Sequence, residues 1–304
     1  MATSFPTWPT QVTVVDVTPR DGLQDADHFV TSEQKLAFIN ALLDAGVKAI
    51  EATSFMHPKW IPQLADADYV ASHLPQRADV LYSALIPNMR GYERARTAHI
   101  EEITLVVSAS ESHNQANLNR SVEVSLVQLG EVAERARNDD VVVRGAIATA
   151  FGCPFEGKIA PEAVLRIVRA YAQMEVEQVS LADTIGVGNP HQVFTLFQLA
   201  RQELPENISL SAHFHDRVGY GLANVFAALQ AGVTTFDAAI GGLGGCPYAP
   251  GAPGNLSTET LVEYLEAMGF ATGISLAGLV TAREQLMENL AHGEPVTTGH
   301  SMRR

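Results

Sequence analysis

The sequence is poor in cysteine, in basic residues and in long apolar runs, and each shortage excludes a class of protein. Only two of the 304 residues are cysteines, Cys153 and Cys246, and no CxxC spacing occurs, so zinc or redox sites built on cysteine are excluded. Asp and Glu outnumber Lys and Arg by 34 to 20, and the formal net charge is −14. A chain of this charge lacks the extended basic surface that DNA or RNA binding requires.

The chain also lacks the signals of a membrane or secreted protein. No run of about 18 apolar residues occurs, and no basic segment followed by an apolar core opens the sequence. With so few cysteines, the sequence predicts a cytoplasmic protein without a membrane partner. The 46% hydrophobic content can fill a large core. We expect residues 1–304 to form a single domain, in which residues 281–304 are a C-terminal helix end and a loosely ordered tail.

Eight apolar, β-branched runs alternate with segments of helical periodicity, which favours a parallel sheet with crossover helices. Eight such units in about 250 residues predict an α/β fold, a closed (β/α)₈ TIM barrel with a short additional C-terminal helical segment. A doubly wound open sheet is the alternative, because eight strands can also lie flat. The predicted strands are residues 12–17, 49–53, 80–86, 103–107, 141–149, 178–181, 208–214 and 235–240.

A pair of histidines, His213 and His215, stands where the seventh predicted strand ends. Side chains two residues apart share one face of a strand, so the pair presents two imidazoles side by side. Two ring nitrogens are half of a metal site, although such a pair is more often a packing or surface feature. The pair lies at the carboxyl end of a strand, which is where the catalytic residues of parallel barrels lie, and this position favours metal binding.

The first predicted strand ends in a turn that holds Arg20 and Asp21 between a proline and a glycine. A solvated turn is one interpretation. The other is functional, because an aspartate ligates hard cations and an arginine stabilises developing negative charge. A closed barrel places the first strand beside the eighth and the eighth beside the seventh. Asp21 can therefore reach a cation held by His213 and His215.

Residues 241–255 follow the eighth predicted strand and contain six glycines and three prolines, a composition that excludes regular structure. Such a segment at a barrel mouth is either a plain surface loop or a lid. Cys246 within it is a proton donor or an inert thiol. Asn255 at its end offers an oxygen ligand, or else caps the helix predicted at 256–268.

Two acids, Glu51 and Asp183, end the second and sixth predicted strands. A buried carboxylate without a partner is costly, so each is expected to orient Arg20 or a histidine; the alternative is a capping or surface acid. Residues 152–158 match the glycine and lysine spacing of a phosphate-binding P-loop. The next residue, Ile159, has no hydroxyl for Mg²⁺ and Pro154 removes a backbone N–H, so nucleotide hydrolysis is disfavoured.

Together these motifs resemble the 3-hydroxy-3-methylglutaryl-CoA lyase family, which are metal-dependent carbon–carbon lyases built on a (β/α)₈ barrel. The similarity covers nearly the whole chain. It rests on PRDGLQ at 19–24, EATSF at 51–55, FGCPFEGK at 151–158, DTIGVG at 183–188, HFHD at 213–216 and GGLGGCPYAPGAPGN at 241–255.

The resemblance implies a divalent cation, Mg²⁺ or Mn²⁺, and a CoA thioester substrate. The implied metal ligands are Asp21, His213, His215 and Asn255. Arg20 would stabilise an enolate, His213 or Asp21 would take the substrate's hydroxyl proton, and Cys246 would transfer a proton. The residues expected to support the site are Glu51, Asp183 and Glu259, and those expected to contact the CoA thioester are Gln24 and Lys158.

The implied reaction is the cleavage of 3-hydroxy-3-methylglutaryl-CoA to acetyl-CoA and acetoacetate, by a homo-oligomer, a dimer or a tetramer. Two departures from the family leave a related 3-hydroxy-3-alkylglutaryl-CoA open as the substrate. Residues 217–220 read Arg-Val-Gly-Tyr where the family more often has Thr-Tyr-Gly-Gln. Residues 25–27 read Asp-Ala-Asp where the animal enzymes have Asn, Glu and Lys.

Three other functions compete with this interpretation. A condensing synthase of the same superfamily joins acetyl-CoA to a 2-keto acid, but such enzymes usually read RDGEQ where this chain has Leu23, and they lack the GGCPYAPGA segment. A metal-dependent hydrolase ordinarily carries its histidine pair on the first strand. A catalytically silent barrel that binds metal or acyl-CoA is disfavoured, because the full set of polar strand ends is present.

Overall fold

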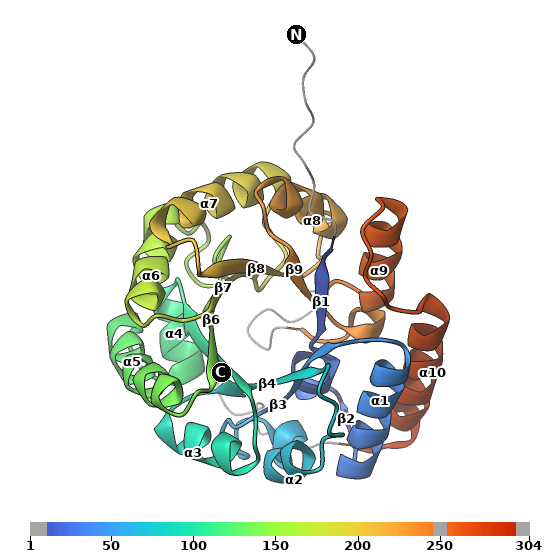
Figure 1. Ribbon diagram of the computed structural model, residues 1–304. Coiled ribbons are helices and arrows are strands. Elements are labelled where there is room, and N and C mark those ends of the chain that lie inside the picture. Colours follow the sequence, from blue (N-terminus) through green and yellow to red (C-terminus); the bar gives the residue numbers. More distant parts are fainter. Residues whose placement is uncertain (1–10, 246–253, 296–304) are drawn as a thin grey trace.

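Eight parallel strands close into a barrel that a ring of helices surrounds (Figure 1). The structure is a computed structural model and describes residues 11–245 and 254–295. Val14 lies opposite Phe236, which closes the ring between the first and last strands. The closed (β/α)₈ barrel is thus confirmed and the open sheet excluded. The barrel strands, in order around the ring, are β1 Thr13–Asp16, β3 Ala49–Ser54, β4 Leu81–Ile86, β5 Glu102–Ser108, β6 Val142–Ala148, β7 Gln178–Asp183, β8 Ser209–Phe214 and β9 Thr235–Ala238.

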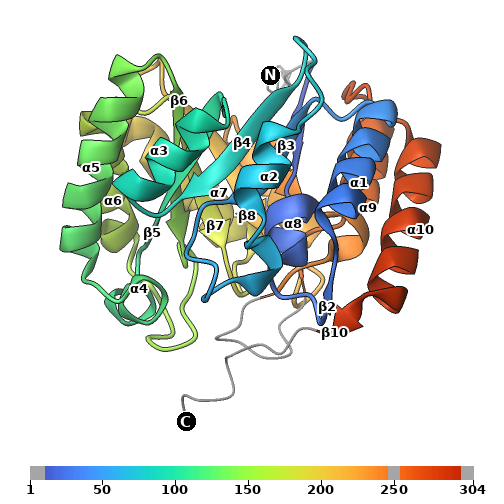
Figure 2. The same cartoon turned by 90° about the horizontal axis from the view of Figure 1, so that it is seen from below.

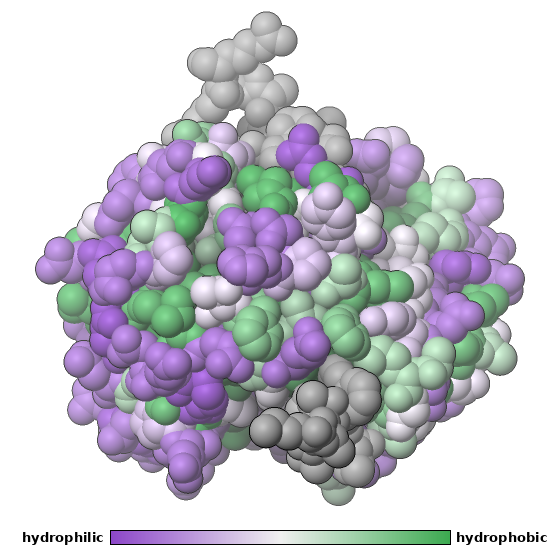
Figure 3. All heavy atoms as spheres, turned by 90° about the horizontal axis from the view of Figure 1, so that it is seen from above, coloured by the Kyte–Doolittle hydropathy of each residue, from purple (hydrophilic) through white to green (hydrophobic). Residues whose placement is uncertain are grey.

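The helices cover the outside of the barrel with their apolar faces. In α6, for example, Val164, Ile167, Val168 and Tyr171 are buried, three or four residues apart, as one face of a helix requires. The surface over α7 and α8 is largely hydrophilic with small hydrophobic patches (Figure 3). The helices are α1 Ser32–Asp44, α2 Ala67–Ser72, α3 Met89–Thr97, α4 Glu111–Leu118, α5 Val122–Asn138, α6 Pro161–Gln173, α7 Pro190–Glu203, α8 Gly221–Gln230, α9 Thr258–Ala267 and α10 Leu276–His292.

Local sequence signals set several helix ends. Thr31 caps α1 in a capping box with Gln34, as expected from the residues around Ser32. Gly46, at φ +98°, turns the chain away after this helix in a conformation that favours glycine. Pro161 occupies the first turn of α6, where its missing N–H has no helical partner to lose.

A short antiparallel ribbon lies beside the barrel, between β2 His28–Phe29 and β10 Glu294–Pro295. The polar composition of residues 293–304 carries no sign of this pairing. The helix before it, α10, packs against α1 and α9. The assignment of residues 1–304 to one domain with a loosely ordered tail stays a prediction.

The carboxyl ends of the barrel strands gather at one end of the molecule, the lower end in Figure 2, near β2 and β10. Here β9 ends at Ala238, two residues before its predicted end, because the N–H of Ala239 bonds Leu256 O instead. A single 3₁₀ turn, η3 Ile240–Gly242, follows. Gly241 and Gly242 in this turn have left-handed φ angles of +60° and +70°, so the first residues of the glycine-rich segment form a turn and no regular helix. Among the described residues, no helix is long and apolar enough to cross a membrane.

Candidate active site

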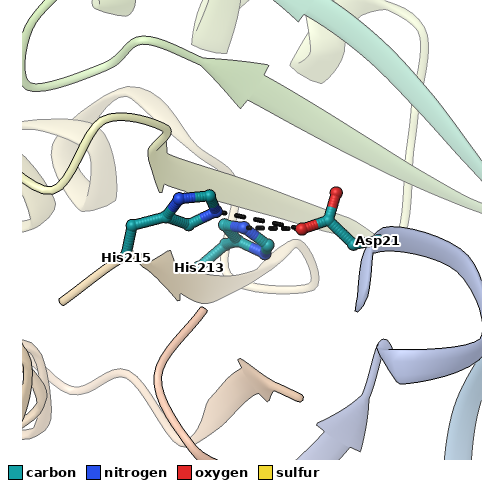
Figure 4. Close-up of side chains that lie close together, drawn as sticks. All are labelled: Asp21, His213 and His215. Carbon is teal, nitrogen blue, oxygen red and sulfur yellow. Dashed lines mark ion pairs between the residues drawn. The ribbon is translucent and has the colours of Figure 1, made fainter. Parts of the chain in front are cut away.

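Asp21, His213 and His215 converge at the carboxyl-terminal end of the barrel (Figure 4). The Nε2 atom of His213 lies 3.9 Å from Asp21 Oδ2, and that of His215 lies 3.8 Å from the same oxygen. One ligand atom from each residue lies within 4.8 Å of the others, and all three side chains are buried. A carboxylate oxygen and two imidazole nitrogens in one place can bind a divalent cation. The predicted convergence of these three residues is confirmed.

The backbone after β1 explains how Asp21 reaches the histidines. Residues Thr18–Gly22 form one π-helical turn, η1, which Pro19 opens and in which the N–H of Asp21 bonds Val17 O at 2.8 Å. Thr18 Oγ1 accepts a hydrogen bond from the N–H of Ile240 at 2.7 Å, which ties the turn to the segment after β9. This turn directs the Asp21 side chain inward, toward the end of β8.

Asn255 reaches the same place because its segment extends the sheet between β8 and β9. The N–H of Leu256 bonds Phe214 O at 2.9 Å, and the N–H of Ala239 bonds Leu256 O at 3.0 Å. Asn255 therefore lies opposite His215 in an isolated β-bridge. The cap of α9 is Ser257, which accepts from the N–H of Thr260, so Asn255 is not the helix cap that the sequence left open.

The side chain of Asn255 fits the role of a cation ligand. Its Nδ2 donates to Asp21 Oδ2 at 2.7 Å and to Leu243 O at 2.9 Å. With both amide hydrogens bound to acceptors, Oδ1 is the remaining polar atom, and it is buried without a partner among the described residues. Oxygen ligands from a carboxylate and an amide, with two imidazoles, suit a hard or borderline cation such as Mg²⁺ or Mn²⁺.

Arg20 lies beside the candidate metal ligands and is held by two acids. Its Nε donates to Glu51 Oε2 at 2.5 Å, and its Nη1 donates to Asp21 Oδ1. Burial alone would raise the pKa of Asp21, but the Arg20 guanidinium and the nearby histidines hold that pKa well below its usual range. Asp21 is therefore ionised, as a metal ligand must be. Glu51 orients Arg20, one of the two roles that the sequence left open for it.

The other two predicted supporting acids hold loops at the barrel mouth. Asp183, at the end of β7, accepts hydrogen bonds from the N–H groups of Val187 at 3.1 Å and Gly188 at 2.8 Å. Its backbone oxygen accepts from the N–H of His215 at 3.3 Å, but among the described residues its carboxylate makes no hydrogen bond to Arg20 or to either histidine, so the structure shows the turn-capping role for this side chain. Glu259 accepts from the N–H of Gly241 at 2.9 Å and supports the start of the glycine-rich segment. The catalytic roles of both acids stay predictions.

The remaining predicted residues contribute less to the described geometry. Lys158 is exposed and Gln24 half-buried, and within the described ranges no hydrogen bond or ion pair joins either side chain to the metal-ligand residues. Cys246 lies outside the described residues. The P-loop-like segment is a tight turn closed by reciprocal backbone bonds between Cys153 and Gly157, which uses N–H groups that a phosphate cradle would need.

The fold and this geometry were compared with known proteins. Residues 11–286 match the HMGL-like family. The chain belongs to the HMGL-like family. Among its HMGL-like relatives is the hydroxymethylglutaryl-CoA lyase YngG of Bacillus subtilis, which is 43% identical over 289 residues, 95% of this chain and 96% of that protein. The hydroxymethylglutaryl-CoA lyase of Pseudomonas mevalonii is 41% identical over 265 residues, 87% of this chain and 88% of that protein.

Solved HMGL-like structures share the whole barrel. The crystal structure of the Bacillus subtilis HMG-CoA lyase gives a TM-score of 0.90 at 42% identity and covers 95% of this chain and 97% of that chain. An HMG-CoA lyase from Acinetobacter baumannii, solved in complex with coenzyme A and 3-methylmalate, gives a TM-score of 0.88 at 40% identity over 97% and 96% of the two chains. The family resemblance seen in the motifs is confirmed.

Sequence reasoning missed two charged residues in this HMGL-like barrel. Asp237 of β9 lies 3.1 Å from the Nδ1 atom of His213, and Arg144 of β6 lies 2.7 Å from Asp237. Both are buried. The available signal was a lone charged residue within an otherwise apolar predicted strand, since such a charge requires a buried partner.

Proposed function

We propose that this HMGL-like chain cleaves 3-hydroxy-3-methylglutaryl-CoA, or a closely related 3-hydroxy-3-alkylglutaryl-CoA, to acetyl-CoA and a 3-keto acid with the help of a divalent cation. The observation that carries the proposal is the convergence of Asp21, His213 and His215 beside Arg20. The lyases named above, similar over nearly the whole chain, support the same reaction. They give no support to the condensing synthase.

The chain offers four side chains to hold the cation, namely Asp21, His213, His215 and Asn255. When bound, Mg²⁺ or Mn²⁺ supplies Lewis-acid polarisation that makes a substrate hydroxyl more acidic. The hydroxyl proton is expected to go to His213 or Asp21, whose facing atoms lie 3.9 Å apart at this point. Cys246 or a water molecule would return a proton to the acetyl carbanion.

Arg20 is placed to stabilise the enolate that cleavage produces. Its Nε and Nη1 are fixed by Glu51 and Asp21, while Nη2 has no hydrogen-bond partner among residues 11–245 and 254–295. A guanidinium held at two nitrogens presents the third in a defined direction and loses little conformational entropy when a ligand binds. A thioester oxygen that gains negative charge is the expected acceptor at Nη2.

The acyl tail and the CoA portion are expected at the rim, where Gln24, Lys158 and the exposed Arg217 lie beyond the strand ends. Arg217 adds a cation to this rim, which favours an anionic ligand and permits a tail that differs from that of the family. Homo-oligomeric assembly and a part in leucine degradation and ketone-body formation are further predictions that rest on the same family membership. Cytoplasmic location remains a prediction from the low cysteine content.

A coupled assay across a panel of 3-hydroxy-3-alkylglutaryl-CoA thioesters tests reaction type and tail preference together. We expect acetyl-CoA to form only when Mg²⁺ or Mn²⁺ is present, and EDTA to abolish it. The same protein incubated with acetyl-CoA and 2-keto acids should release no free thiol. Thiol release there, with no cleavage of any panel member, would overturn the lyase in favour of the synthase.

A further inference from the structure

The two histidines of the metal site are held in different ways. His213 has a carboxylate behind it, since Asp237 Oδ2 lies 3.1 Å from its Nδ1 atom, on the ring edge opposite the Nε2 that faces Asp21. His215 has no such support, because its Nδ1 is buried without a hydrogen-bond partner in the described part of the chain. Of the two candidate ligands, only His213 thus has a carboxylate next to its Nδ1 atom.

Asp237 is itself fixed from behind. Arg144 Nη2 donates to both of its oxygens, at 2.7 Å and 2.9 Å, and also to the hydroxyls of Ser180 at 3.1 Å and Ser211 at 3.0 Å. Arginine is always protonated in proteins and only donates, so both carboxylate oxygens of Asp237 act as acceptors toward it, as those of an ionised carboxylate do. Asp237 is therefore an anion inside the barrel, with its charge offset by Arg144.

An ionised carboxylate only accepts hydrogen bonds. The His213 nitrogen beside Asp237 must then be the donor, an Nδ1–H, and the lone pair of the neutral ring is left on Nε2, which faces Asp21. We propose that Asp237, neutralised by Arg144, is a positioning residue that fixes this tautomer and ring orientation of His213 and so prepares Nε2 to bind the cation. Histidine ligands commonly take such support from a carboxylate.

The substitution Asp237→Asn turns this arrangement into a sharp test. An amide has one acceptor oxygen, which Arg144 claims, so its NH₂ group is left to face His213 Nδ1. That nitrogen must then accept, and the ring is driven to the Nε2–H tautomer with no lone pair toward Asp21. Side-chain volume and shape hardly change. Loss of such a supporting partner typically lowers metal affinity by about 10–100-fold.

The experiment measures Mn²⁺ binding by electron paramagnetic resonance and the His213 tautomer by ¹⁵N NMR of histidine-labelled, metal-free protein. The His213 signals are assigned by their loss in His213→Gln. We expect an Nδ1–H ring in the unsubstituted protein, and an Nε2–H ring with about 10–100-fold weaker Mn²⁺ binding in Asp237→Asn. The matched control is Asp66→Asn, which also removes a carboxylate from a buried cation, Lys35, at 2.7 Å, and should leave both readouts unchanged.

Two results would overturn the proposal. One is an Nε2–H ring in the unsubstituted metal-free protein, a measurement that stands even if Asp237→Asn does not fold. The other is a folded Asp237→Asn protein with unchanged Mn²⁺ affinity. The inference rests on the proposed metal site but not on the lyase reaction, because neither readout uses a thioester. A protein that passes both tests yet cleaves no thioester would refute the proposed function alone.

Discussion

Asn255 donates its side-chain amide to Asp21 at 2.7 Å, although 234 positions separate the two residues in the chain. The bond joins the turn after β1 to the segment before α9 at the point where both meet the end of β8. The interaction also leaves Asn255 Oδ1 at the candidate metal site without a partner among the described residues. One residue therefore joins two segments at the rim of the barrel and adds a fourth candidate ligand.

Replacing Asn255 should impair both roles, and two different measurements can tell the two effects apart. Asn255→Ala removes the candidate oxygen ligand, and we expect Mn²⁺ affinity to fall at least about tenfold, with a modest loss of stability of roughly 1 kcal/mol from the broken hydrogen bonds. Calorimetric titration with Mn²⁺ and thermal unfolding without metal measure the two effects. Asn189→Ala, which removes the cap of α7, is the control. It should cost about 1 kcal/mol of stability and leave the affinity unchanged. Equal affinities in both variants would argue against the ligand role.

Arg20 should be indispensable for turnover. Arg20→Met removes the donor that faces the developing enolate and leaves Glu51 and Asp21 without their shared cation, so we expect kcat to fall by a factor of about 10³ or more. His213→Ala should lose turnover to a similar extent. Steady-state kinetics with the best thioester of the panel measure both. The control is Arg77→Met, which breaks an exposed ion pair with Asp44 and should behave as the unsubstituted enzyme. Near-normal rates in Arg20→Met would defeat its assignment.

Gly145 of β6 is predicted to be the more sensitive of two glycines. A Cβ at Gly145 would lie 2.7–2.8 Å from three ring atoms of the fully buried Tyr171, whose hydroxyl is held by Leu105 O at 2.7 Å. Gly145→Ala should therefore destabilise the fold by about 1–3 kcal/mol. At Gly130, inside α5, the nearest atom is Met174 Cε at 3.8 Å, so Gly130→Ala should stabilise by up to about 1 kcal/mol. Urea unfolding compares the two variants, and the same sign in both would contradict the packing argument.

Asp16 should make stability fall as pH rises. Its burial raises the pKa to about 6, although Thr18 and Thr258 donate hydrogen bonds to it. The folded state therefore binds this proton more tightly than the unfolded chain, and the stabilising contribution present near pH 4 is lost as pH rises through about 6. Relative to Asp16→Asn, the unsubstituted protein should lose roughly 2 kcal/mol between pH 4 and pH 7. If the difference in the free energy of unfolding between the two proteins is the same at pH 4 and at pH 7, the effect is ruled out.

The sequence was sufficient for the barrel and for three of the candidate ligands. The strand pattern with its eight repeats predicted the fold, and strand periodicity together with barrel closure predicted that Asp21 meets His213 and His215. These inferences depend only on local periodicity and on the neighbours that a closed ring imposes.

The rest depends on contacts that no local pattern encodes. Asp237 and Arg144 lie in apolar strands, of which one face points to the barrel interior and the other to the helices. Composition alone does not say on which of the two faces each residue lies. Asn255 stayed ambiguous between ligand and helix cap, because only the pairing of its segment with the ends of β8 and β9 decides the matter. The Asp183 carboxylate accepts hydrogen bonds from backbone N–H groups of the loop that follows it, and the residue type alone does not predict these partners.

The position of Arg144 also bears on how the barrel forms and breaks. One nitrogen of this residue on β6 contacts groups on β7, β8 and β9, at separations of 36, 67 and 93 residues. Such distant contacts are available only after the last strands have closed the ring, so they should be absent from the rate-limiting step of folding. Arg144→Met would then accelerate unfolding far more than it slows refolding, and stopped-flow measurements can determine both rates. In that case the contacts of Arg144 form late in folding and set the lifetime of the native state.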